Sequence, residues 1–198
     1  MIELLAITDD PTPTPPPLRI VPVGGLGLVV GAAAEADVID AEALWHREDL
    51  IEELMRERTL LPVRYRTVVE DDTAAAEAVA ERAEALKAAL RRVRGAVELS
   101  VRVLMRAEIG ESTPGEHLQA RAAGERAAAA MHQRLAAAAR EHARQIGPGL
   151  LRGAYLVDRV EIDGFVALVR ELQNEHPELS AVCTGPWPPY SFSGEEGA

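Results

Sequence analysis

The histidines and the single cysteine are the residues whose chemistry could support metal binding or nucleophilic catalysis. No two of the five histidines have the i, i+4 spacing of a helical zinc site. His132 and His142 lie in one predicted helix, but their ten-residue separation does not place them on one face. Cys183 lies in a strand-like pattern without a basic neighbour, which indicates a small buried apolar residue.

Two acidic runs and one glycine-rich stretch are the other candidates for chemistry. Glu52-Glu53 and Glu70-Asp71-Asp72 are typical of solvated faces or helix starts. The stretch 24–27 lacks the third glycine of a dinucleotide fingerprint and precedes a strand, so it predicts a hairpin turn. We therefore expect no catalytic residue, no metal and no cofactor.

The most informative pattern is the run from Gly185 to Phe192, which reads Gly-Pro-Trp-Pro-Pro-Tyr-Ser-Phe. Stiff prolines reduce the entropy lost when a segment docks, and large rings supply apolar contact area. The docking residues would be Trp187, Pro188, Pro189, Tyr190 and Phe192. Two interpretations stay open: a latch that packs on the protein's own second domain, or a contact with a partner protein.

The first half of the chain predicts strands followed by alternating helices and strands. Gly24-Gly25 separates two short strands, Asp40 is a good helix N-cap, and Gly95 is placed to end a helix. Asp72 or Thr73 is the expected N-cap of a later helix, the one that Gly95 ends. Apolar periodicity predicts strands over 2–7, 18–23, 27–31, 59–69 and 97–104, and helices over 40–58 and 73–94.

The second half predicts a long helix and a small sheet. A polar stretch over 107–116 reads as a linker, and Gly147-Pro148-Gly149 ends the alanine-rich helix that follows it. That helix is either core or a docking surface for a partner helix. The predicted elements are a helix over 117–146, a strand over 150–160, a helix over 162–175 and a strand over 179–184.

This order of elements predicts an α+β protein of two small domains, at 1–108 and 109–198. We expect the first domain to be a variant of the ferredoxin-like fold. We expect the second to combine the long alanine-rich helix with a small sheet, closed by the proline- and aromatic-rich segment.

The composition restricts the partners of the chain. Its net charge of −11 and pI near 5.0 oppose binding to nucleic acids and to anionic membranes, which need clustered Lys and Arg. No apolar run approaches the roughly 20 residues of a membrane span. A single cysteine fits a reducing cytoplasm.

Three stretches resemble the gas vesicle protein F/L family. The Gly185–Phe192 string is a hallmark of that family, including Gly185 and Pro186. The segment from His46 to Thr67 is similar to the family's His followed by Leu-Pro-x-Arg-Phe-Gly-Thr, with Tyr65 and Arg66 in place of Phe and Gly. The third stretch is Ala154-Tyr155-Leu156-Val157, placed as the family places its Tyr-Leu-Val strand, with Phe165 downstream. The matching residues in these stretches and their surroundings are His46, Leu61, Pro62, Arg64, Tyr65, Thr67, Glu98 and Tyr155.

The resemblance implies a non-enzymatic accessory or assembly protein of gas vesicles, located in the cytoplasm and at the vesicle. It implies partners among the gas vesicle proteins, above all the hydrophobic shell protein. No catalytic residue is carried over from the family. The alternative is a small-molecule-binding or regulatory α+β domain without catalysis.

Overall fold

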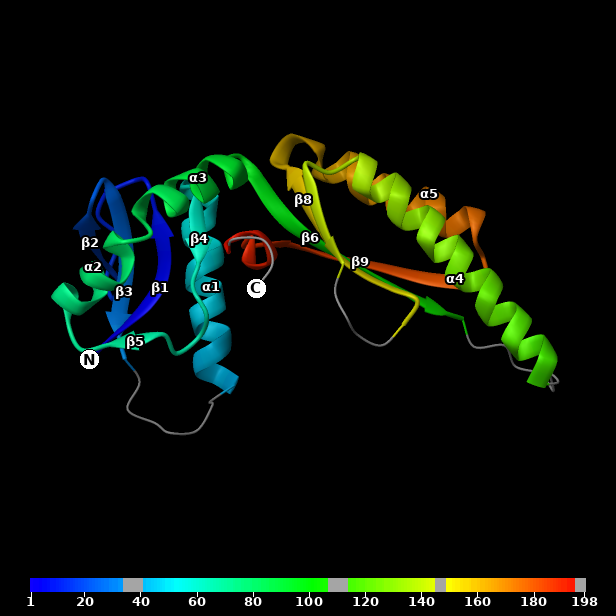
Figure 1. The fold of residues 1–198 in the computed structure, drawn as a ribbon, viewed down its shortest axis with the longest axis horizontal. Helices are drawn as coiled ribbons and strands as arrows, with labels where there is room; N and C mark the ends of the chain where they lie inside the picture. Colours follow the sequence, from blue (N-terminus) through cyan, green and yellow to red (C-terminus); the bar gives the residue numbers. More distant parts are fainter. Residues whose placement is uncertain (34–40, 107–113, 145–148, 195–198) are drawn as a thin grey trace. The chain divides into compact units, whose positions relative to one another are not determined.

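The computed structural model describes residues 1–33, 41–106, 114–144 and 149–194 (Figure 1). These residues divide into two compact units. One comprises Met1–Gly95 and the segment that starts at Pro188, and the other comprises Ala96–Trp187. The expected α+β class is confirmed. Asp40, the proposed N-cap, and most of the predicted linker lie outside the described residues.

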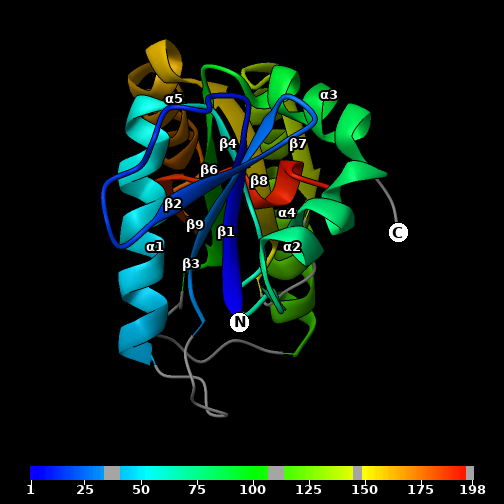
Figure 2. The ribbon, with the colours of Figure 1, turned by 90° about the vertical axis from the view of Figure 1, so that its left-hand side faces the viewer.

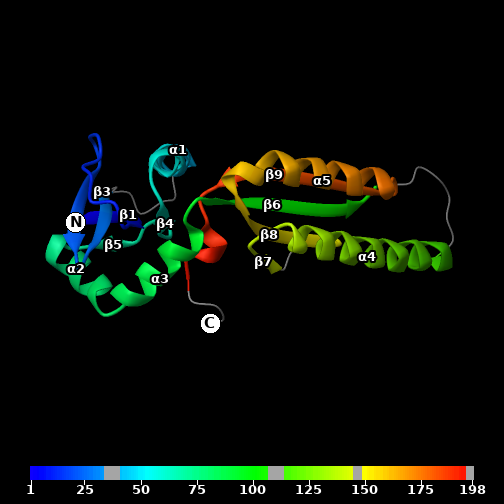
Figure 3. The same ribbon diagram turned by 90° about the horizontal axis from the view of Figure 1, so that it is seen from above.

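The first unit is built on an antiparallel sheet in the order β2-β3-β1-β4, with β5 pairing with β1. Helix α1 lies on one side of the strands, and α2 and α3 lie on the other (Figures 2 and 3). Its elements are β1 (Ile2–Thr8), β2 (Arg19–Val23), β3 (Leu26–Ala32), α1 (Ala41–Glu57), β4 (Leu60–Pro62), β5 (Val68–Val69), α2 (Asp72–Ala80), α3 (Ala83–Val93) and η2 (Tyr190–Phe192).

Local chemistry explains where these elements begin and end. Gly24 and Gly25, with φ of 55° and 83°, form the predicted hairpin turn between β2 and β3. The single strand expected over 59–69 is wrong, because a turn at 63–67 separates β4 from β5. The single helix expected over 73–94 is two helices. Asp71 caps the first of them by accepting from the N–H groups of Thr73 and Ala74.

The second unit has the order of a ferredoxin-like fold, strand-helix-strand-strand-helix-strand, with an antiparallel sheet ordered β7-β8-β6-β9. Helices α4 and α5 cover one face of this sheet (Figure 3). The elements are β6 (Ala96–Met105), α4 (Pro114–Ala137), β7 (Glu141–Arg144), β8 (Leu151–Asp158), η1 (Arg159–Glu161), α5 (Ile162–Glu175) and β9 (Leu179–Trp187). The ferredoxin-like order is therefore found in the second unit, whereas we had expected it in the first.

Two expectations about the second half also differ from the structure. The long helix ends at Ala137 rather than near 146, because the chain turns and β7 pairs with β8. The unit boundary falls at Gly95/Ala96 rather than at 108/109, since β6 pairs along its length with β8 and β9. None of the helices in the described ranges combines the length and apolar character that a membrane crossing needs.

Candidate functional site

The proline- and aromatic-rich string is divided between the two units. Gly185, Pro186 and Trp187 complete β9, and the residues from Pro188 onward belong to the first unit. Gly185 has a φ of 121°, and a Cβ there would lie 2.8 Å from the carbonyl oxygen of Glu98. Glycine is therefore required both by the backbone angle and by the close approach of β6.

The aromatic residues of the string differ in burial. Trp187 is 38% exposed, and its indole N–H donates to the Thr184 hydroxyl over 3.2 Å. Phe192 is 4% exposed, and its carbonyl oxygen accepts a 2.6 Å hydrogen bond from Arg92 of α3. Phe192 thus closes on the first unit, whereas Trp187 remains accessible.

Tyr190 anchors the segment to α1. Its hydroxyl donates to the Glu48 carboxylate, with oxygen–oxygen distances of 2.8 and 3.0 Å, and accepts from Arg47 over 3.1 Å. Burial, followed by the hydrogen bond to Glu48, raises the pKa of Tyr190 above its ordinary value. Tyr190 and Phe192 therefore pack on the first unit, whereas the latch interpretation placed the string on the second domain. Partner contact through the string stays a prediction.

Arg47 is the centre of this arrangement, and the sequence analysis did not identify it. Its side chain is 4% exposed, and its guanidinium forms an ion pair with Glu3 over 3.1 Å. It also donates to the carbonyl oxygens of Leu5 and Val63, and lies 5.7 Å from the ring centre of Tyr65. One side chain therefore ties α1 to β1, to the end of β4 and to the C-terminal segment.

A sequence signal for Arg47 did exist. The position lies on the apolar stripe of α1, three residues after Leu44 and four before the buried Ile51. An arginine at a core-facing helix position needs several acceptors, because a buried charge without partners is very costly. His46, which the family pattern pointed to, is exposed beside it.

The segment from Leu61 to Thr67 forms a compact turn against β1. Leu61 and Pro62 are buried in β4, whereas Arg64 is exposed and its carbonyl oxygen accepts from both the N–H and the hydroxyl of Thr67. Arg66 has a φ of 63°, in the left-handed region that glycine favours. Its N–H donates to Glu3 over 2.9 Å, so the turn joins the same network as Arg47.

A second polar group lies inside the second unit. Tyr155 is fully buried on β8, and its hydroxyl lies 2.7 Å from Nδ1 of His132 on α4. The ring of His142, on β7, meets that of His132 edge-on at 5.0 Å. The two histidines come together because they occupy a helix and a strand, not one helix as expected.

Electrostatics at this group favour uncharged side chains. Burial lowers the pKa of His132, and the nearby His142 and Arg144 lower it further. Burial also raises the pKa of Tyr155 and of the half-buried Cys183. The described ranges contain no group of three or more His, Cys, Asp or Glu side chains able to hold a metal. We interpret the group as a hydrogen-bonded part of the core.

Glu98, another residue of the family pattern, is buried on β6. It pairs with Leu156 on one side and with Trp187 on the other, at the point where the β6–β9 register shifts. Glu98 thus lies beside Gly185 and Trp187, although 87 residues separate Glu98 from Gly185 in the sequence.

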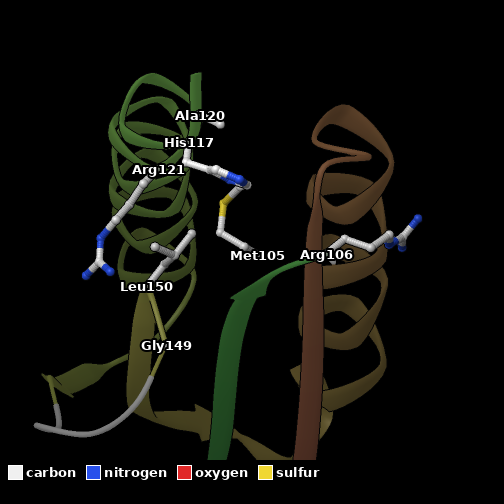
Figure 4. Close-up of a pocket in the computed structure, with 7 residues that line it drawn as sticks. All are labelled: Met105, Arg106, His117, Ala120, Arg121, Gly149 and Leu150. Atoms are coloured by element: carbon white, nitrogen blue, oxygen red, sulfur yellow. The ribbon is translucent and has the colours of Figure 1, made fainter. Parts of the chain in front are cut away.

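A pocket of about 550 Å³ lies between α4, the end of β6 and the start of β8 (Figure 4). Met105 and Leu150 provide its apolar surface, and the His117 ring points toward Met105. The guanidinium groups of Arg106 and Arg121 point away on opposite sides. This volume is within the range of small-molecule sites.

Comparison with known proteins gives one consistent result. The sequence model of the family described as "Gas vesicle synthesis protein GvpL/GvpF" matches residues 12–123 and 115–194. Gas vesicle protein F of Streptomyces sp. (strain CB03234) is 31% identical over 90% of this chain and 88% of its own length. Gas vesicle protein L of the same strain is 30% identical over 90% of this chain and 84% of its own length.

Solved structures show the same fold. The crystal structure of the gas vesicle protein GvpF from Anabaena sp. PCC7120 aligns with a TM-score of 0.81 over 99% of both chains, at 16% identity. That of GvpF from Microcystis aeruginosa aligns with a TM-score of 0.78 over 98% of this chain and 99% of the other, at 17% identity. The chain therefore belongs to the gas vesicle protein GvpL/GvpF family.

Proposed function

We propose that this protein is a non-catalytic assembly factor that binds the hydrophobic gas vesicle shell protein and supports vesicle formation. The observation that carries the proposal is the family match, which extends from residue 12 to residue 194 and so includes both units. The proposed partners are the shell protein and other gas vesicle proteins.

The surface of the chain is consistent with this role. Large apolar side chains are exposed at Trp45, Leu118, Val160, Val182 and Trp187, and such side chains often anchor partners. The net charge of −11 would keep a complex with an apolar protein in solution. Binding would thus hold an aggregation-prone subunit until it joins the growing shell.

Deletion of the coding region in a vesicle-forming host tests the proposal. Electron microscopy should show few or no vesicles, and a plasmid copy of the gene should restore them. Growth without a requirement for buoyancy should be unchanged. Normal vesicle number and shape in the deletion strain would contradict the proposed function.

The pocket beside α4 favours a second candidate function, the binding of a small apolar molecule. Ala120 lines this pocket, so Ala120→Trp should fill it. If the pocket serves vesicle formation, this variant should fail to complement the deletion strain although it folds. Full complementation by Ala120→Trp would show that vesicle formation does not need the pocket. The proposed assembly function would be unaffected by that result.

A further inference from the structure

The outer edge of β9 is an unusual feature of the second unit. β9 ends the sheet, since it pairs with β6 on one side and with no other strand among the described residues. Its nine residues, Leu-Ser-Ala-Val-Cys-Thr-Gly-Pro-Trp, include no charged side chain. Exposed edge strands usually carry charges or prolines that prevent pairing with other chains.

Two other outer strands have such protection. β7, at the opposite edge of the same sheet, carries Glu141 and Arg144 within four residues. β2, at one end of the first sheet, carries Arg19 and Pro22. β9 has one proline, Pro186, and it lies near the end of the strand.

The hydrogen bonds identify which backbone groups of β9 face outward. The N–H of Arg106 donates to the carbonyl oxygen of Glu178, so alternate residues from 178 onward bond to β6. Leu179, Ala181 and Cys183 then direct their backbone groups away from the sheet. The outward direction is confirmed at two of them, because the Gln173 side chain bonds to Leu179 and Ala181.

Gln173 of α5 closes only part of this edge. Its amide oxygen accepts from the N–H of Ala181 over 2.5 Å, and its amide nitrogen donates to the carbonyl of Leu179 over 2.6 Å. This imitates the contact of a neighbouring strand. The carbonyl of Ala181 and both backbone groups of Cys183 have no partner within the described part of the chain.

The side chains beside these open groups are uncharged and partly apolar. Val182 is 52% exposed, and Thr184 and Trp187 are exposed on the same face of the sheet. The hydrogen bond from Trp187 to Thr184 holds the indole beside the edge. Every second side chain of an added strand would therefore lie on the same face as Val182 and Trp187 and could contact them.

We propose that the Ala181–Gly185 edge of β9 binds an extended, uncharged segment of the shell protein as an additional antiparallel strand. The segment would form backbone hydrogen bonds with Ala181 and Cys183 and place apolar side chains against Val182 and Trp187. This inference deepens the proposed function and relies on it for the identity of the partner. A second copy of the chain is disfavoured, because each copy carries a net charge of −11.

A synthetic peptide tests the edge without the shell protein. The probe is a ten-residue peptide of alternating threonine and valine, labelled with fluorescein and titrated by anisotropy. The peptide should bind, and methylation of its alternate backbone nitrogens should weaken binding at least tenfold, since its side chains are unchanged. Equal binding of the methylated peptide would overturn the proposal.

Matched protein variants test the same contact from the other side. Cys183→Pro removes an outward N–H that takes no part in the β6 pairing, so circular dichroism should be unchanged while peptide affinity falls at least tenfold. Cys183→Val keeps the N–H and should bind like the wild type. Unchanged affinity in Cys183→Pro would overturn the proposal. If that variant does not fold, the test is the comparison of methylated and unmethylated peptide on the wild-type protein.

Two further measurements complete the test: binding of the shell protein, and light scattering of the purified chain without a partner. Shell protein that binds wild type but not Cys183→Pro supports the inference, whereas equal binding to both overturns it and leaves the proposed function intact. Peptide binding without any shell-protein binding would instead contradict the proposed function. Light scattering should show a monomer; a dimer lost in Cys183→Pro would assign the edge to a second copy and overturn the proposal.

Discussion

Replacing Arg47 is the most demanding test of how the first unit is held together. Arg47→Met keeps an unbranched stem and removes the donors to Glu3, Glu48, Tyr190 and two carbonyl groups. Glu3 would then keep a largely buried carboxylate, supported by the N–H of Arg66 but without its cation. Loss of one partner of a buried ion pair costs about 3–5 kcal/mol, a large share of a typical stability of roughly 5–15 kcal/mol.

Urea unfolding followed by circular dichroism measures this loss. With a slope of about 2 kcal/mol per molar urea, the midpoint of the first unit should fall by roughly 2 M. His46→Ala changes the exposed neighbour on the same helix and is the control, with a shift below about 0.3 M. A loss under about 1 kcal/mol in Arg47→Met would refute the central role of this side chain.

Four further predictions test other parts of the structure. Arg66→Gly should raise the free energy of unfolding by roughly 0.5–1 kcal/mol, since φ is 63° there, and a lower melting temperature would contradict this. Phe192→Ala should cost about 3–5 kcal/mol in thermal melts, whereas the more exposed Trp187→Ala should cost far less; equal losses would refute the assignment of the latch. Burial lowers the pKa of His132, so its contribution to stability is present above about pH 6.5 and is lost as the pH falls through its lower folded-state pKa. His132→Phe should flatten that slope in urea titrations from pH 5 to 8, and an unchanged slope would exclude His132 as its source. Leu86→Asp should unfold the first unit, because Leu86 is buried on α3, and an unchanged circular dichroism spectrum would show otherwise.

Local patterns predicted much of the fold. The β2–β3 hairpin, β6 and α5 were predicted within a few residues, because each has a strong apolar period and clear turn or cap residues. β7 was missed because its residues continue an alanine-rich stretch with high helix propensity. Pairing with β8 outweighs that propensity, and no local signal reports such a pairing.

The candidate site was predictable only in part. The string at 185–192 was recognised from its composition, but not its division between two units, which depends on long-range pairing. Arg47 was missed because the apolar stripe of α1 is defined by apolar residues, and a buried arginine does not belong to that pattern. His132 and His142 were treated as members of one helix, whereas the turn after Ala137 brings their rings to 5.0 Å.

The proposed function requires this chain to bind the gas vesicle shell protein. The most direct measurement is a titration of the purified chain over immobilised shell protein from the same host, read by interferometry. We expect saturable binding by the wild-type chain. Phe192→Ala should reduce binding only in proportion to the fraction of unfolded chain, and Cys183→Pro should weaken it at least tenfold. Absence of saturable binding by folded wild-type protein would contradict the proposed function.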